Sequence, residues 1–121
     1  WYASRWGRDD VVEILLANNA DVNKANRQGQ TPLYAASSGD HSNIVQLLLS
    51  NNADVNKAEM SGSTPLLEAI VEDFSDVVEL LVANNADVKM ANNDGQTPLK
   101  FAREFDKQDV VKILEAAGAN E

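Results

Sequence analysis

A group of acidic side chains in the third quarter of the chain is the first place to look for chemistry. One short segment carries Glu72, Asp73, Asp76 and Glu79. Paired carboxylates can act as a general acid and base, or they can gather oxygen ligands around Ca²⁺. A calcium site draws its oxygens from a constrained loop with a glycine at the sharp turn. This segment instead straddles a predicted helix end with no such glycine, so we expect a solvated acidic face and no metal site.

The other groups that catalysis would need are scarce. The chain has no cysteine and a single histidine, His41, so disulfides and thiolate metal sites are excluded. Gly29, Gly62 and Gly95 stand far apart and do not form a phosphate-binding loop. No nucleophile, base and charged partner stand together in a pattern that indicates an active site. We expect a protein that is not an enzyme and that uses no cofactor.

Composition and charge narrow the remaining classes. Hydrophobic residues make up 44% of the 121 residues, which is enough for a core, but no apolar run approaches the ~20 residues that a membrane span needs. Nineteen acidic residues against ten basic ones give a formal charge of −9, which argues against nucleic acid as a partner. There is no signal-peptide pattern, and the first residue is Trp1. We expect a chain that begins inside a longer protein or after a trimmed segment, and a cytoplasmic location, or a recombinant source if the chain is engineered.

A period of 33 residues runs through the whole chain. The octet NNADVNKA occupies residues 18–25 and returns at 51–58, and a close variant, NNADVKMA, stands at 84–91. Thr-Pro-Leu recurs in the same phase, with a glycine two residues before each threonine and an alanine five residues after it. A repeat of this length indicates stacked supersecondary units, each of which buries its apolar face against its neighbours.

Each copy predicts a turn and two helices. The glycine before Thr-Pro-Leu supplies the turn. Threonine then caps a short helix, and proline takes its first position, where no N–H is needed. A second helix follows, for example over 42–49, with apolar residues at helical spacing. It ends at the Asn-Asn pair, where left-handed backbone is expected at Asn19, Asn52 and Asn85, and at Gly118 in the last copy.

The rest of the octet forms a return loop. Its valine should bury its side chain between neighbouring units, and its aspartate should hydrogen-bond the backbone of the turn. The valines are Val22, Val55 and Val88, and the aspartates are Asp21, Asp54 and Asp87. We infer that the octet repeats because every unit must turn in the same way in order to stack.

These segments resemble the ankyrin repeat family. The resemblance lies in GQTPLYAA, GSTPLLEA and GQTPLKFA, joined by NNADVN at the 33-residue period, and it covers essentially the whole chain. It implies an all-α fold, a curved solenoid of stacked helix-turn-helix units joined by β-turn loops. We expect one ankyrin repeat domain over residues 1–121. Its units are a truncated first repeat at 1–25, full repeats at 26–58 and 59–91, and a C-terminal repeat at 92–121.

Two positions depart from the usual pattern of that family. The histidine that follows Thr-Pro-Leu is replaced by Tyr34, Leu67 and Lys100. The Gly-His pair before the second helix survives only as Asp40-His41, Asp73-Phe74 and Asp106-Lys107. The resemblance gives His41 a structural place in the loop between helices. The departures leave the predicted fold intact and indicate a sequence tuned for something other than consensus stability.

The resemblance implies a non-catalytic module that binds a protein partner on its concave face. Two sets of positions vary while the scaffold positions repeat. The turn tips are Arg27, Gln28 and Gln30; Met60, Ser61 and Ser63; and Asn93, Asp94 and Gln96. The predicted exposed stripe of the first helices is Tyr2, Arg5 and Trp6; Ala35, Ser38 and Gly39; Glu68, Val71 and Glu72; and Phe101, Glu104 and Phe105.

Partner contacts should concentrate in part of these sets, strongest at the segment WYASRW. Trp, Tyr and Arg dominate interface hot spots because each buries a large area and keeps a polar handle. We predict contacts from Trp1, Tyr2, Arg5, Trp6, Arg27, Gln28, Gln30, Tyr34, Ser38, Met60, Ser61, Val71, Glu72 and Phe105.

Several interpretations stay open at this level. Trp1 and Tyr2 could equally cover the end of the stack, and Phe101 suits the core better than contact. The acidic third copy is either a solvated surface or an attractor for a basic partner. The chain could be an engineered binder, a natural regulatory or scaffolding fragment, or a structural spacer, and it could act as a monomer or in a heterocomplex with its partner. Asn23 and Asn56 also have the Asp-Val-Asn spacing that asparaginyl hydroxylases accept in ankyrin repeats.

Overall fold

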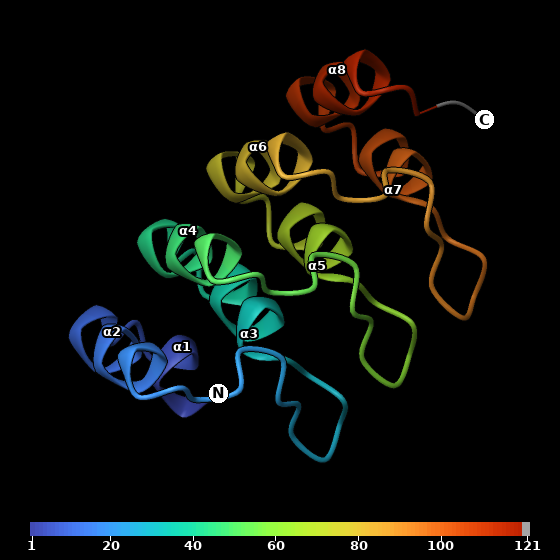
Figure 1. The fold of residues 1–121 in the computed structure, drawn as a ribbon. Helices are drawn as coiled ribbons and strands as arrows, with labels where there is room; N and C mark the ends of the chain where they lie inside the picture. Colours follow the sequence, from blue (N-terminus) through green and yellow to red (C-terminus); the bar gives the residue numbers. More distant parts are fainter. Residues whose placement is uncertain (120–121) are drawn as a thin grey trace.

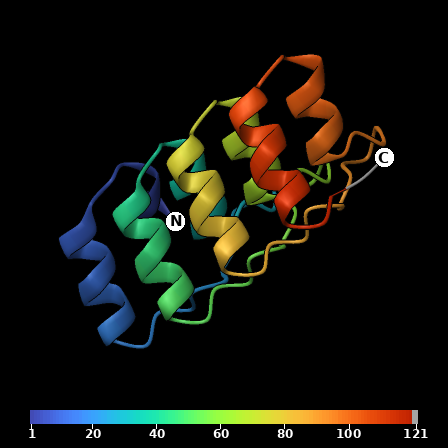
Figure 2. The same ribbon diagram turned by 90° about the horizontal axis from the view of Figure 1, so that it is seen from above.

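The computed structural model describes residues 1–119 as a stack of antiparallel helix pairs arranged in two rows (Figures 1 and 2). The inner row contains α1 (Tyr2–Arg5), α3 (Pro32–Ser38), α5 (Pro65–Val71) and α7 (Pro98–Glu104). The outer row contains α2 (Asp9–Ala17), α4 (Ser42–Ser50), α6 (Ser75–Ala83) and α8 (Gln108–Ala116). The described residues contain no strand. The predicted all-α solenoid is confirmed; the expected end of its last unit, at residue 121, lies outside the described residues.

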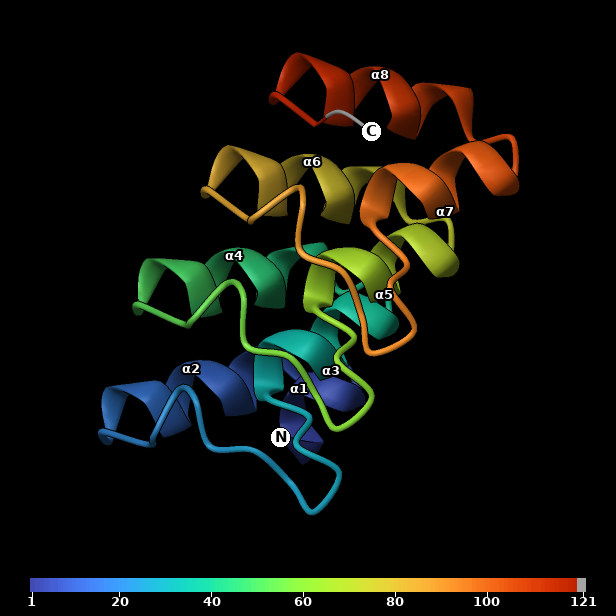
Figure 3. The ribbon, with the colours of Figure 1, turned by 90° about the vertical axis from the view of Figure 1, so that its right-hand side faces the viewer.

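The turns that lead into the inner helices all project in the same direction (Figure 3). Each turn is followed by a threonine cap: the Oγ1 atoms of Thr31, Thr64 and Thr97 accept a hydrogen bond from the backbone N–H three residues later, at 3.1–3.2 Å. Proline occupies the first turn of each of these helices. Such a cap stabilises a helix by about 1 kcal/mol. The predicted caps are confirmed.

Each of the first three outer helices ends on two asparagines that do different work. Asn18, Asn51 and Asn84 donate from Nδ2 to the carbonyl four residues earlier, at 2.8 Å in every copy. The next residue takes the left-handed conformation, with φ of 64°, 67° and 67° at Asn19, Asn52 and Asn85, and Gly118 does the same with φ 97°. The predicted left-handed stop is confirmed. The side-chain cap made by the first asparagine was not predicted from the sequence.

The return loops tie neighbouring helix pairs together. The predicted turn bonds of Asp21, Asp54 and Asp87 are present: each Oδ1 accepts from the backbone N–H two residues later. Asn23 Oδ1 also accepts from the backbone N–H of Asp54, and Asn56 Oδ1 accepts from that of Asp87, both at 2.7 Å. These two bonds cross from one pair to the next, so the loop sets the register of the stack.

A continuous hydrophobic core fills the space between the rows. Leu33, Leu66 and Leu99 contribute from the inner helices, and Ile44, Val77 and Val110 from the outer ones, all at most 1% exposed. The loop valines behave as predicted: Val88 is buried, and Val22 and Val55 are partly buried against the core. Each pair buries its apolar side chains against the next pair, as in other solenoids.

The first pair differs from the later ones because no preceding pair packs against its outer helix. Leu15 is 45% exposed, whereas Leu48, in the same phase one repeat later, is 2% exposed and Leu81 is fully buried. Val11 and Ile14 are also exposed on α2. The same residue type at the same repeat position is therefore surface in one pair and core in the next.

This difference predicts unequal costs for one substitution made at two equivalent leucines. Leu48→Ala should lower the free energy of unfolding by about 2–5 kcal/mol, because it opens a cavity in a packed core. Leu15→Ala should cost less than about 1 kcal/mol, because much of the side chain already contacts water. Urea unfolding followed by circular dichroism would measure both, and equal costs would contradict the burial described for α2.

Candidate partner-binding surface

One row of side chains runs along the stack where the inner helices end. We call it the inner stripe, and it consists of Arg5 and Trp6, Ser38 and Gly39, Val71 and Glu72, and Glu104 and Phe105, one neighbouring pair of residues from each inner helix. Three large apolar side chains in it face solvent: Trp6 is 68% exposed, Val71 45% and Phe105 57%. Glu72 and Glu104 are exposed as well. The stripe therefore presents apolar and acidic groups side by side.

Aromatic contacts organise both ends of the stripe. The guanidinium carbon of Arg5 lies 5.5 Å from the ring centroid of Trp6, within the range of a cation–π contact. At the far end Phe105 stacks on Phe101, with ring centroids 5.9 Å apart and planes at 17°. Phe101 is partly buried and packs against the core, as expected, so the exposed ring of Phe105 rests on a fixed support.

The first two residues face different ways. Tyr2 is exposed, and its ring meets that of Trp1 edge to face at 5.2 Å. Trp1 is half-buried and lines a small cavity of about 50 Å³, together with Val12 and Leu15. Trp1 thus covers the end of the core, and Tyr2 is the more accessible of the two rings.

The middle of the stripe is a notch with almost no side chain. Ser38 Oγ donates to the carbonyl of Ala35 at 3.0 Å, so the hydroxyl folds back onto its own helix. At Gly39 an added Cβ would lie 2.5 Å from Nε2 of His41. The same His41 nitrogen lies 3.2 Å from the carbonyl oxygen of Arg5, so the ring joins the first two helix pairs. This is the structural place that the sequence resemblance gave to His41.

The structure corrects the predicted role of Tyr34. It was predicted to contact a partner, but its side chain is 8% exposed and its hydroxyl donates to Oε2 of Glu68 at 2.9 Å. Ala35, predicted to be exposed, is fully covered. Both residues lie on α3, which packs between α1 and α5. A side chain on that flank meets a neighbouring helix before it reaches solvent.

Burial controls the ionisation of the Tyr34–Glu68 pair. Burial raises the pKa of the Glu68 carboxyl above its usual value; the bond from Tyr34 opposes this rise, and the carboxylates of Glu72 and Glu59 add to it. Burial and the acceptor Glu68 also raise the pKa of Tyr34, so the tyrosine keeps its proton. The hydrogen bond from the neutral Tyr34 hydroxyl to Glu68 therefore links α3 to α5.

The turn tips form a second accessible set. Arg27, Gln28, Met60 and Ser61 are exposed, as predicted. Consecutive tips are joined through the backbone: Met60 N–H donates to Gln28 O at 3.0 Å, and Asn93 N–H donates to Ser61 O at 2.9 Å. The tips are therefore held in register with one another.

Gln30 does a different job from the one predicted for it. It is partly buried, and its Oε1 accepts from Nδ2 of Asn26 at 3.1 Å. Oδ1 of Asn26 accepts from the backbone N–H groups of Gln28 and Gln30, both at 3.0 Å. Glu59 and Asn92 hold the next two turns in the same way. The sequence did not indicate this role, because position 26 lies at the boundary between two units.

The acidic segment singled out in the sequence is divided between two elements. Glu72 and Asp73 follow α5, while Asp76 and Glu79 are exposed on α6. In residues 1–119 no three histidine, cysteine or carboxylate side chains converge as metal ligands. Across the same residues no helix is both long and apolar enough to cross a bilayer.

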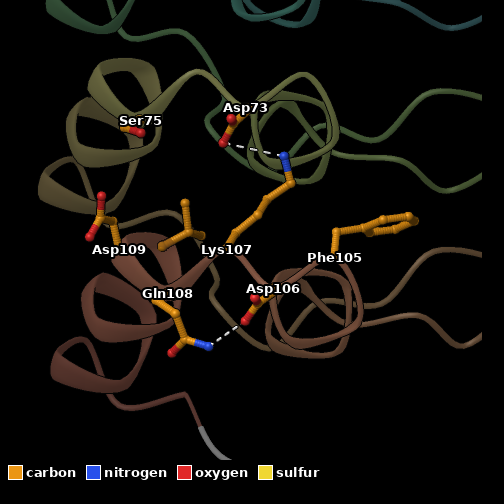
Figure 4. A pocket seen from close by; sticks show the side chains of 8 residues that line it. Asp73, Ser75, Phe105, Asp106, Lys107, Gln108 and Asp109 are labelled. Atoms are coloured by element: carbon orange, nitrogen blue, oxygen red, sulfur yellow. Dashed lines mark hydrogen bonds and ion pairs between the residues drawn. The ribbon is translucent and has the colours of Figure 1, made fainter.

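A shallow cleft of about 420 Å³ lies where the loops of the last two helix pairs meet (Figure 4). Lys107 Nζ lies 3.2 Å from Oδ1 of Asp73 across this cleft, and the Lys107 side chain is largely buried. Gln108 Nε2 donates to Oδ1 of Asp106 at 2.6 Å. The ion pair joins the two helix pairs and neutralises Lys107, whereas the bond between Gln108 and Asp106 lies within the last pair.

The comparisons with known proteins agree with this architecture. A family model described as ankyrin repeats (3 copies) matches residues 1–92 and 56–120, so the chain belongs to the ankyrin repeat family, a non-enzymatic fold that generally serves in protein interactions. A stretch of 36 residues, 30% of this chain, is 53% identical to a transient receptor potential cation channel subfamily A member 1 homolog from Caenorhabditis elegans. The match spans 3% of that protein's length.

The close approach of Gly39 and His41 predicts strong coupling between them. Gly39→Ala should lower the free energy of unfolding by about 1–3 kcal/mol, because the new methyl group must displace the packed ring. In a His41→Ala background the same change should cost much less. A double-mutant cycle measured by urea unfolding would give the coupling, and additive effects would show that the ring does not limit position 39.

The raised pKa of Glu68 predicts a pH-dependent effect of Glu68→Gln. Because its folded-state pKa is raised, the charged carboxylate is disfavoured in the fold, and the contribution of Glu68 to stability falls as pH rises through that pKa. The variant has no such loss. Its free energy of unfolding should therefore rise relative to that of the unaltered chain as pH increases from about 4 through the folded-state pKa of Glu68.

Urea unfolding across this pH range would measure that difference. Tyr34→Phe is the companion variant: it removes the bond that lowers the pKa of Glu68, so the pH dependence should steepen. A difference between Glu68→Gln and the unaltered chain that is independent of pH would contradict the assignment.

Proposed function

We propose that this chain is a non-catalytic protein-binding module that recognises a protein partner through its inner stripe and its turn tips. One observation carries the proposal. The threonine caps, the asparagine stops and the octet loops each recur three times nearly unchanged, while the inner stripe changes completely from one helix to the next. Three large apolar side chains are exposed within that variable row, and exposed apolar groups rimmed by polar ones are typical of interaction sites.

Rigid presentation is the proposed mechanism. The Asn23 and Asn56 bonds between return loops and the backbone bonds between turn tips fix each helix pair relative to the next. The cost of ordering the binding surface is therefore met during folding, and more of the gain from burying Trp6 and Phe105 appears as affinity. A standard interface takes about 800 Å² from each partner, an area that a stripe and tips spanning the whole stack can offer.

The proposal covers more than one origin. An engineered binder and a natural regulatory or scaffolding module would both use this surface, whether the chain is a monomer or part of a heterocomplex. Identical octets beside a fully varied stripe support the engineered origin. A structural spacer would not need the stripe, so substitutions there distinguish it from both.

The proposal predicts that three substitutions in the stripe abolish partner capture. The chain and its Arg5→Ala/Trp6→Ala/Phe105→Ala variant would serve as parallel baits in a cell lysate, with quantitative mass spectrometry as the readout. Capture of the partner should fall at least about tenfold, because hot-spot truncations cost more than about 1 kcal/mol each. Circular dichroism would establish that the variant stays folded.

The matched control is Arg8→Ala/Val11→Ala/Ile14→Ala, which removes one arginine and two exposed apolar side chains from the end of the stack. This variant should capture the partner as the unaltered chain does. Equal capture by the stripe variant would move binding to another face, and no specific capture by any bait would favour the spacer.

A further inference from the structure

The sign of the charge changes along the inner stripe. We count with it the residue that directly follows the stripe in each helix pair. The first pair carries Arg5, and the second carries the carboxylate of Asp40. The third carries Glu72 and Asp73, and the fourth carries Glu104 and Asp106. The row is thus positive at the Trp6 end and carries two carboxylates in each of the last two pairs.

Among the described residues, Glu72 and Glu104 take part in no ion pair. In residues 1–119 the ion pairs are Lys107 with Asp73, at 3.2 Å, and Arg103 with Glu115 of α8, at 3.9 Å. The charge of Lys107 is therefore paired within the scaffold, and Arg103 lies toward α8 of the outer row. Both stripe glutamates are exposed, and the carboxylate of Glu72 also helps to raise the pKa of Glu68. Negative potential thus accumulates over the ends of α5 and α7.

Apolar anchors stand next to these free carboxylates. Val71 precedes Glu72 at the end of α5, and Phe105 follows Glu104 at the end of α7. Both apolar side chains are about half exposed. Between Val71 and Trp6 lie the small residues Ser38 and Gly39, and the His41 ring fills the space beside Gly39. Apolar and acidic groups therefore alternate on a surface that is open along its length.

We propose that the partner presents a basic segment that lies along this stripe. Its lysine or arginine side chains pair with Glu72 and Glu104, and its apolar side chains cover Val71 and Phe105. The end of the segment over Arg5 and Trp6 carries no positive charge, because Arg5 would repel it. Complementary charges steer the approach and set the register, and the buried apolar side chains hold the complex. This inference rests on the proposed function and adds to it the partner's chemistry and direction.

The test uses a random 12-residue peptide library displayed on phage and panned against the whole chain. Enriched peptides would be synthesised, and their affinities measured by fluorescence anisotropy. Peptides that carry at least two lysines or arginines together with aromatic or branched apolar residues are expected. Their affinity should fall about fivefold or more for Glu72→Gln/Glu104→Gln, since each exposed charge pair contributes up to about 1 kcal/mol. It should also fall as salt is raised.

Glu13→Gln/Glu79→Gln is the matched control, because it removes the same charge from exposed positions on α2 and α6. Binding of the enriched peptides should change less than about twofold in this control, since exposed charges that make no contact with the peptide contribute little. Equal losses in both variants would attribute binding to net charge alone and overturn the inference.

Two further outcomes separate this inference from the proposed function. Enriched peptides that lack basic residues but lose binding to Arg5→Ala/Trp6→Ala/Phe105→Ala would overturn the basic segment and support the stripe. Peptides that bind all variants equally, or a library that yields no enrichment, would overturn both.

Discussion

The whole structure depends on burial between neighbouring helix pairs, because no pair here can bury its apolar side chains alone. Two short helices enclose little volume, so Leu48 and Leu81 become core only when adjacent pairs cover them. This constraint explains why the threonine caps, the paired asparagines and the return loops recur so faithfully. A pair that turned differently would lose both the apolar contact and the bond from Asn23 or Asn56 to the next loop.

Because repeated positions carry the stability, the ends of the inner helices are free to differ. Trp6, Gly39, Glu72 and Phe105 occupy the same place in successive copies, yet two are aromatic, one is acidic and one has no side chain. Gly39 is the exception that shows the limit of this freedom, since His41 leaves no room for a side chain there. Elsewhere the stripe carries apolar and charged groups that the scaffold does not use. Its basic neighbours, Lys107 and Arg103, are committed to carboxylates of the scaffold, which leaves the stripe acidic toward its end.

Local features of the fold were predictable from the sequence, and features that depend on neighbours were not. Threonine caps, left-handed asparagines and aspartate turns depend on a few adjacent residues, so their pattern was sufficient. The prediction that Tyr34 contacts a partner was wrong because the flanking helices cover its ring. Its hydroxyl donates a hydrogen bond to Glu68, more than thirty positions away. The bond between Asn26 and Gln30 within the turn was likewise not indicated by the sequence. Position in the repeat indicated which face these residues share, but not which of them reach solvent.

The sequence by itself determined the repeat, its all-α class, the helix boundaries and the row of variable positions, because each of these follows from short-range geometry repeated at a constant period. Only the tertiary structure decided which variable side chains are free, that Leu15 is surface while Leu48 is core, and that Lys107 and Arg103 are paired whereas Glu72 and Glu104 are left to solvent. Burial and charge pairing are set by what lies beside a residue in space, and in a stack that neighbour comes from the adjacent copy.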